Sequence, residues 1–211
     1  MNKRNYQREL EMLIEGLPKE SEAPTLLLHS CCAPCSSYVL EYLSAYFEIV
    51  LYFYNPNITE PEEYKKRKAE LVRLVEVNHY PNPVRLLDGD YDNRLFFEMA
   101  EGLEKEPECG RRCFRCYDMR LRKTAEMAAK DGADYFCTTL SISPHKKADK
   151  LMEIGEMLSK EYGISYLPSD FKKKNGYKRS IELSREYHLY RQNYCGCVYS
   201  REAAQGREEC K

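Results

Sequence analysis

The chain has 211 residues, with 33 Lys and Arg against 34 Asp and Glu, so its formal net charge is −1. Hydrophobic residues make up 43% and charged residues 32%, a balance that excludes a mostly disordered or fibrous chain. No apolar run approaches the ~20 residues of a membrane-spanning helix. The first 16 residues are too charged for a secretory signal, so we expect a cytoplasmic protein with no membrane partner.

The predicted elements alternate between helices and strands. Strands are predicted for five apolar segments, at residues 25–30, 49–54, 84–87, 135–140 and 164–167. Helices are predicted at residues 1–17, 38–46, 61–77, 91–103, 117–130, 146–162 and 180–191. Apolar strands that alternate with helices in this way are typical of a parallel sheet that helices cover on both faces.

We therefore predict a three-layer α/β domain with a parallel sheet and a C-terminal helical extension. Residues 1–23 are assigned to an N-terminal helix and linker, and residues 24–170 to the α/β domain. Residues 171–211 form a basic extension, which we assign to the same domain. The chain is long enough to bury a core of its own, so its 10 cysteines are not needed as disulfide staples.

Three cysteines, Cys31, Cys32 and Cys35, lie between the first predicted strand and the helix that follows it. In a parallel sheet, ligands bind at the carboxyl ends of the strands, which is where this segment falls. A helix N-terminus also favours the thiolate, the form that binds metals. These cysteines are therefore predicted metal ligands, and buried core cysteines are the alternative.

A second cluster has the spacing Cys109-x3-Cys113-x2-Cys116. The Cys-x2-Cys pair fits zinc, an iron–sulfur cluster or a redox pair, and Cys109 strengthens the metal interpretation. Together the two clusters hold six thiols. That number exceeds the four ligands of one tetrahedral zinc or one iron–sulfur cluster, so a second metal or a further role is expected for the others.

The third cluster is Cys195-Gly196-Cys197. A disulfide across one residue closes a small, strained ring, and a strained disulfide is easily reduced. Cys195 and Cys197 are therefore predicted to be a redox pair, with further metal ligands or two free thiols as alternatives. The chain has no glycine-rich dinucleotide or phosphate loop, so reducing equivalents are expected to enter through metal and thiols or from a partner protein.

Basic residues and tyrosines are interleaved near the C-terminus. Such a pattern suits nucleic acid, because cations contact phosphates and aromatic rings stack on unpaired bases. The cations of this run are Lys172, Lys173, Lys174, Lys178 and Arg179. A second basic set is contiguous with the second cysteine cluster and comprises Arg111, Arg112, Arg115, Arg120, Arg122 and Lys123. A solvated helical face is the alternative explanation of both sets.

Taken together and in order, these motifs resemble the QueH type of epoxyqueuosine reductase. The resemblance starts at about residue 24 and covers nearly all of the chain after it. It is carried by the segments 29–36, 109–116, 138–146, 170–173 and 190–197. It implies a Rossmann-like fold similar to ATP-pyrophosphatase and adenine-nucleotide hydrolase domains. It also implies reduction of the epoxide of epoxyqueuosine at the tRNA wobble position, the last step of queuosine synthesis.

The resemblance further implies a [4Fe-4S] cluster with the ligands Cys31, Cys32, Cys113 and Cys116, and a redox-active disulfide between Cys195 and Cys197. It implies an additional iron beside the cluster, and Cys35 and Cys109 are the candidates for its neighbourhood. The five cations at residues 172–179 are then expected to hold the tRNA backbone, and an unidentified donor to supply electrons. The main alternative is a zinc-stabilised nucleic-acid-binding protein without catalysis, which explains the adjacent pair Cys31-Cys32 poorly.

Overall fold

A computed structural model describes residues 4–18 and 22–209 of the chain. The first three residues of the predicted N-terminal helix, residues 19–21 of the predicted linker, and Cys210 lie outside the described residues. Within the described ranges, no helix is long and apolar enough to cross a membrane.

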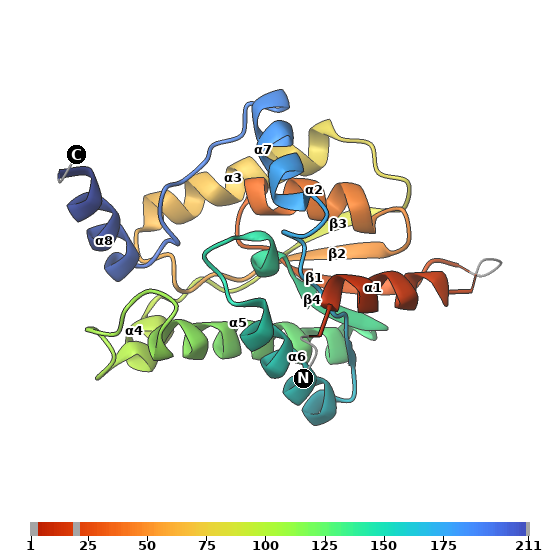
Figure 1. Ribbon diagram of the computed structural model, residues 1–211, viewed down its shortest axis with the longest axis horizontal. Helices are drawn as coiled ribbons and strands as arrows, with labels where there is room; N and C mark the ends of the chain where they lie inside the picture. The colour runs from red at the N-terminus through yellow and green to blue at the C-terminus, as the bar shows by residue number, and fades with distance from the viewer. Residues whose placement is uncertain (1–3, 19–21, 210–211) are drawn as a thin grey trace.

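Helices and strands follow one another along the described chain (Figure 1). The strands are β1 (Thr25–His29), β2 (Glu48–Phe53), β3 (Val84–Asp88), β4 (Tyr135–Thr138) and β5 (Ser165–Tyr166). The α-helices are α1 (Tyr6–Glu15), α2 (Ala33–Leu43), α3 (Pro61–Val77), α4 (Arg94–Ala100), α5 (Arg111–Asp131), α6 (Ala148–Tyr162), α7 (Gly176–Glu186) and α8 (Val198–Glu209). A short 3-10 helix, η1 (Thr139–Ile142), continues directly from β4.

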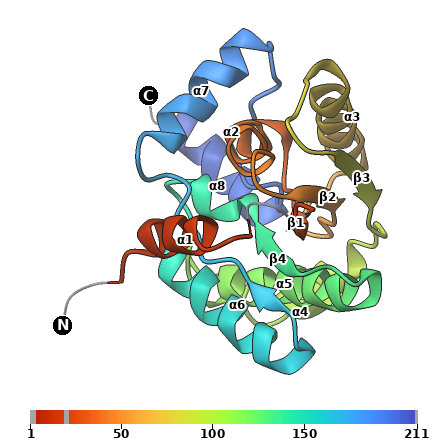
Figure 2. The same ribbon diagram turned by 90° about the vertical axis from the view of Figure 1, so that its right-hand side faces the viewer.

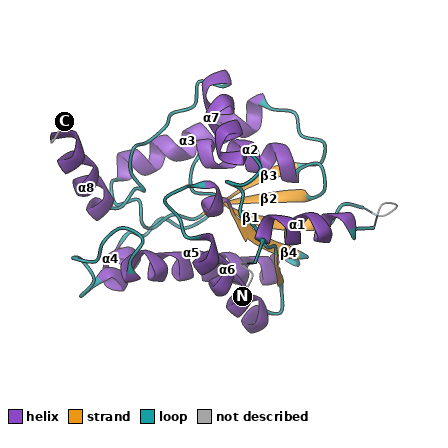
Figure 3. Cartoon of the chain, in the orientation of Figure 1, coloured by secondary structure: helices purple, strands orange, loops and turns teal. Residues whose placement is uncertain are grey.

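The strands form one parallel sheet in the order β3-β2-β1-β4-β5. Helices α2, α3 and α7 lie on one side of it and α4, α5 and α6 on the other, as two roughly perpendicular views show (Figures 1 and 2). Figure 3 shows the sheet as the middle layer between them. The predicted three-layer, Rossmann-like α/β fold is confirmed.

Alternating side chains of the central strands enter two separate cores. In β1, Leu26 and Leu28 pack toward α2 and α3, while Leu27 packs toward α5 and α6. In β2, Leu51 faces the first core and Val50 the second. Because both faces of these two strands are covered, each of them is an almost continuous apolar run.

The sheet has its topological switch point between β1 and β4. From β1 the chain adds β2 and β3 on one side, and then β4 and β5 on the other. The loops that leave neighbouring strands at such a point diverge and open a crevice at the carboxyl edge of the sheet. The cysteine-rich segment after β1 and the segment after β4 border this crevice.

The predicted boundaries of three helices at the site were wrong. Helix α2 spans Ala33–Leu43 instead of 38–46, so Cys35 lies in its first turn. Helix α5 begins at Arg111 rather than after Cys116, so Cys113 and Cys116 lie three residues apart on its first turns. No helix-breaking residue directly follows Gly110. Two cysteines with the spacing of metal ligands can lie on a helix, because residues three positions apart are neighbours on its surface. Helix α7 begins at Gly176 and ends at Glu186, instead of spanning 180–191. The chain then turns through His188, which has a positive φ of 50°.

Helix α8 was not predicted at all. It begins at Val198, directly after the last cysteine pair. Sequence hydrophobicity gives little signal here because most residues of this helix are polar or charged and few are apolar. Its start matters for the site, because Ser200 in its first turn bonds the backbone of the cysteine loop.

Replacing Gly155 with Ala is expected to lower the free energy of unfolding by about 1–3 kcal/mol. Gly155 lies in α6 against the ring of Tyr166, and a Cβ at this position would come within 2.3 Å of the ring. Urea denaturation measures the effect. Gly206→Ala in α8 is the matched control, since a Cβ there meets nothing within 4 Å and the helix propensity improves. Equal stability of the two variants would contradict the packing argument.

Candidate metal–thiol site

The first cysteine cluster forms a compact group of sulfurs at the start of α2. The Sγ atoms of Cys31, Cys32 and Cys35 all lie within 4.8 Å of one another, and those of Cys31 and Cys32 are 3.7 Å apart. Cys32 is the N-cap of α2 and Pro34 lies in the first turn. Interactions with the Cys31 and Cys35 thiols hold the pKa of Cys32 well below its usual value. Sulfurs this close, with one thiol favouring its anion, suit a soft metal.

The second and third clusters meet around a small cavity of about 20 Å³, which we call the smaller cavity. Cys113 and Cys116 line it from α5, and Cys195 and Cys197 line it from the loop before α8. Burial raises the pKa of the Cys116 thiol to about 12, against the attraction of Arg120. The fold therefore brings together four thiols from segments about eighty residues apart in the sequence.

A larger cavity, of about 250 Å³, lies beside these sulfurs. Cys31, Cys35 and Cys195 line it, together with residues from the segment after η1 and the loop between α7 and α8. Its position is at the carboxyl ends of β1 and β4, the crevice where parallel sheets bind ligands. Cys195 lines both cavities and so connects the two cysteine groups.

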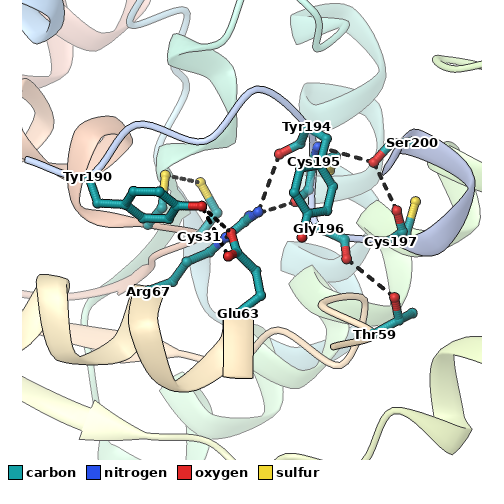
Figure 4. A network of polar contacts seen from close by, with 11 residues as sticks. Cys31, Thr59, Glu63, Arg67, Tyr190, Tyr194, Cys195, Gly196, Cys197 and Ser200 are labelled. Carbon is teal, nitrogen blue, oxygen red and sulfur yellow. Dashed lines mark hydrogen bonds and ion pairs between the residues drawn. The ribbon is translucent and has the colours of Figure 1, made fainter. Parts of the chain in front are cut away.

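The loop that carries Cys195 is held by its backbone (Figure 4). The Cys195 N–H donates to Ser200 Oγ at 3.1 Å, and the Cys195 carbonyl accepts from Arg67 Nη1 at 2.9 Å. The Gly196 carbonyl accepts from the Thr59 N–H at 3.1 Å. Gly196 has a φ of 123°, and a Cβ would come within 2.9 Å of Ile58. Only glycine fits this turn.

Four buried cations surround the sulfurs. Arg67 is 2% exposed, Arg112 4%, Arg120 1% and Lys146 7%. Arg67 pairs with Glu63 at 2.7 Å, and the Lys146 Nζ lies 3.2 Å from the Cys195 sulfur. In the described part of the chain, the structure gives Arg120 no carboxylate partner. Its Nη1 lies 4.0 Å from the Cys116 sulfur.

The charge that these buried cations need nearby indicates whether the cysteines fit a metal–sulfur group. A buried guanidinium is costly unless negative charge lies nearby. Thiolates that ligate a metal are anions even when buried, and they supply that charge to Arg120 and Lys146. The residues present therefore fit a thiolate-bound metal or iron–sulfur group. This holds both for the cysteines at the start of α2 and for those around the smaller cavity.

His29 lies at the end of β1, immediately before the first cluster. It is fully buried, and its ring contacts Thr138 Oγ1 at 2.8 Å and Arg120 Nε at 3.3 Å. Burial and the Arg120 charge lower the pKa of His29 to about 3. The imidazole is therefore neutral at neutral pH, and it helps to place the Arg120 guanidinium beside the sulfurs.

Two other cysteines of the described chain lie apart from the sulfur groups, and Cys109 is the one of them that was a predicted site residue. Cys109 has a positive φ of 63°, and its Sγ contacts the His145 carbonyl at 2.7 Å. In the described chain it lines neither cavity. Cys137 is buried in the sheet, where its thiol contacts Leu167 and Ser169.

None of the five predicted tRNA-binding cations, all of which the structure describes, lines the larger cavity, and three of them make ion pairs within the chain. Lys172, Lys173 and Lys174 line a separate pocket of about 580 Å³ beside the start of α1. Lys172 pairs with Asp170 at 2.5 Å, Lys174 with Glu11 at 2.5 Å and Arg179 with Glu41 at 2.6 Å. The second basic set does not form an exposed surface at Arg112 and Arg120, which are 4% and 1% exposed.

Sequence reasoning missed the roles of Arg67, Lys146 and Arg120 at the site. Arg67 lies on a helix of alternating charges, where nothing distinguishes a buried arginine from a solvated one. Arg120 was counted as a nucleic-acid contact. Lys146 belongs to one of the segments that carry the resemblance, which was the only available signal for it.

Comparison with known proteins shows which family the chain belongs to. The model of the family "Epoxyqueuosine reductase QueH" matches residues 26–203. The chain belongs to the QueH family. A QueH relative from Streptococcus pyogenes serotype M1, named epoxyqueuosine reductase, is 46% identical over 93% of this chain and 78% of its own length. QueH relatives from Staphylococcus epidermidis and Thermotoga maritima are 43% and 35% identical, over 93% and 83% of this chain and 84% and 90% of their own lengths.

Proposed function

We propose that this chain reduces the epoxide of epoxyqueuosine in the tRNA wobble position to give queuosine. The observation that carries the proposal is the larger cavity at the switch point of the sheet, lined by Cys31, Cys35 and Cys195 in a member of the QueH family. The test is to incubate the anaerobically purified protein with epoxyqueuosine-containing tRNA and a reductant, and to analyse the nucleosides by mass spectrometry. Absence of queuosine with fully metal-loaded protein would refute the proposal.

The reaction needs two electrons and two protons. Both carbon–oxygen bonds of the epoxide break, a carbon–carbon double bond forms, and the oxygen leaves as water. Oxidation of the Cys195 and Cys197 thiols to a disulfide releases two electrons and two protons, which balances the equation. An electron donor of the cell then reduces the disulfide. The position of Cys195 in the lining of the larger cavity supports this role.

The ligand set that we propose for a [4Fe-4S] cluster is Cys31, Cys32, Cys113 and Cys116. When bound, such a cluster supplies one-electron transfer and a Lewis-acidic iron. Cys35 and Cys109 are proposed to lie near an additional iron. The closeness of Cys35 to Cys31 and Cys32 supports its part of this assignment.

Lys172, Lys173, Lys174, Lys178 and Arg179 are proposed to hold the tRNA backbone. A wobble base lies in an unpaired loop, so it is extruded at low cost while cations contact the phosphates. We place this activity in the cytoplasm, where thiols stay reduced.

Replacing Lys173 and Lys178 together with Ala is expected to weaken tRNA binding and to lower the slope of log K against log salt by about 1–2. These two lysines are chosen because the other three cations are already paired with carboxylates. Fluorescence anisotropy titrations at about 50 to 200 mM salt measure the slope. Lys160→Ala, near the far end of α6, is the control. An unchanged slope in the double variant would remove these residues from the interface.

A further inference from the structure

The two cysteines of the Cys195-Gly196-Cys197 unit have different surroundings. Cys195 lines both the larger and the smaller cavity, whereas Cys197 is found only in the lining of the smaller one. Cys197 is 7% exposed and packs with Phe96, Ala100 and Cys116 under α4 and α5. A substrate in the larger cavity therefore meets the Cys195 sulfur, and Cys197 lies behind it.

The backbone keeps this asymmetry in place. Arg67 holds the carbonyl of Cys195, and Ser200 holds its N–H. Gly196 turns at a positive φ with no room for a side chain, and its carbonyl is bonded to the Thr59 N–H. For Cys197 to take the place of Cys195 at the larger cavity, the loop would have to run in the opposite direction. All of these backbone hydrogen bonds would then break.

The Cys195 side chain has a partner of its own in Lys146. The Lys146 Nζ lies 3.2 Å from the Cys195 Sγ and 3.9 Å from a Glu108 carboxylate oxygen. Lys146 belongs to the segment between η1 and α6, and its backbone N–H donates to the Ser143 carbonyl. A buried ammonium with a single distant carboxylate needs a closer negative charge, and the Cys195 sulfur is placed to supply it.

Other charged and titratable groups face this pair from the surrounding elements. Arg67 approaches from α3, and Arg120, Tyr117 and Cys113 approach from α5. Burial opposes the thiolate of Cys195, but attraction to Lys146 and then Arg120 lowers its pKa below the usual value. Lys146 is the only one of these groups for which the structure gives a hydrogen bond to the Cys195 sulfur among the described residues.

We propose that Cys195, rather than Cys197, is the cysteine that meets the substrate, and that Lys146 is a positioning residue that holds its sulfur on the wall of the larger cavity. This inference rests on the proposed function and divides the redox pair into two roles. The Cys195 sulfur faces the epoxide. The Cys197 sulfur bonds to the Cys195 sulfur as the electron pair passes to the epoxide, whose two carbon–oxygen bonds break. The Cys197 thiol supplies one proton of the departing water, and solvent supplies the other.

The test is limited alkylation of the reduced, metal-loaded protein with iodoacetamide in the absence of oxygen, followed by peptide mass spectrometry. In the native chain, Cys195 is expected to react at least about tenfold faster than Cys197, because it is more accessible and pairs with a cation. Equal rates, a faster Cys197, or no reaction at Cys195 would overturn the division of roles.

Variants of Lys146 test the positioning role. Lys146→Met keeps the length of the buried side chain and removes its charge, and it is expected to slow Cys195 alkylation about tenfold. Lys146→Arg retains the charge and is expected to restore most of the rate. The neighbouring Lys147 is exposed, so Lys147→Met is the matched control and should react like the native chain. Unchanged alkylation in folded Lys146→Met would refute the assignment, as would failure of Lys146→Arg to restore it.

Turnover separates this inference from the proposed function. Lys146→Met should lower the single-turnover rate on epoxyqueuosine-containing tRNA about tenfold or more and leave the tRNA dissociation constant unchanged. If the native protein does not reduce this tRNA but the alkylation pattern holds, the proposed function fails and the cysteine roles stand. If the native protein turns over and Lys146→Met equals it in rate, the Lys146 role fails alone.

Discussion

Replacing Cys195 and Cys197 together with Ser is expected to lower epoxide reduction at least about a thousandfold while leaving the iron content unchanged. A serine hydroxyl has nearly the size of a thiol but cannot form a disulfide, so the variant keeps the loop and loses its store of two electrons. The loop itself should persist, since its anchors at Arg67, Thr59 and Ser200 act on backbone atoms.

Single-turnover assays and iron analysis on the same preparation measure both parts of this expectation. Cys137→Ala is the matched control, because it removes a buried thiol that lies in the sheet and lines neither cavity in the described chain. It should turn over at close to the native rate, with a modest loss of stability. Native-like activity of the double variant would show that electrons reach the substrate by another route.

Single Ser replacements at the four proposed cluster ligands are expected to remove most of the iron and acid-labile sulfide and to abolish turnover. Each site in a [4Fe-4S] cluster needs a thiolate, and loss of one also leaves buried Arg120 or its neighbours with less compensating negative charge. The residues are Cys31, Cys32, Cys113 and Cys116. The variants should also unfold at lower temperature than the native holoprotein, because metal binding contributes to folding.

Cys35 and Cys109 provide the comparison within the same experiment. If they serve an additional iron, Cys35→Ser and Cys109→Ser should keep about four irons and four sulfides per chain and lose only the extra metal. Loss of the whole cluster in Cys35→Ser, with retention in one of the four ligand variants, would redraw the ligand set. Stoichiometric zinc without sulfide in the native chain would instead favour the zinc-stabilised nucleic-acid-binding alternative.

Much of the fold could be predicted from local patterns. Helix α3 runs from Pro61 to Val77 exactly as predicted, since proline in the first turn and acidic residues beside it specify a helix start. The apolar runs of β1 and β2 identify strands covered on both faces. Prediction failed where local signals were weak or ambiguous. The first turns of α5 were predicted as a loop because their cysteines have the spacing of metal ligands. Helix α8 was not predicted because its composition is mostly polar.

The sequence predicted the residue types of the candidate site more fully than the arrangement of those residues in space. The three cysteine clusters were recognised from spacing, because metal ligation and disulfide chemistry need sulfurs at short separations. The cations around them were not recognised. Arg67 and Arg120 look like ordinary helix-surface residues in the sequence, and only the structure shows that both are buried beside the cysteines.

By itself the sequence determined the order of the strands and of the helices up to α7, and hence the parallel sheet, together with the three cysteine groups. Period and composition are local properties, and they carry this information without any knowledge of contacts. Only the tertiary structure decided that Cys195 connects the two cavities, and that Lys146, 49 residues away in the chain, lies 3.2 Å from its sulfur. Such contacts depend on how β1, β4 and the C-terminal loop meet at one edge of the sheet, and no local pattern encodes that meeting.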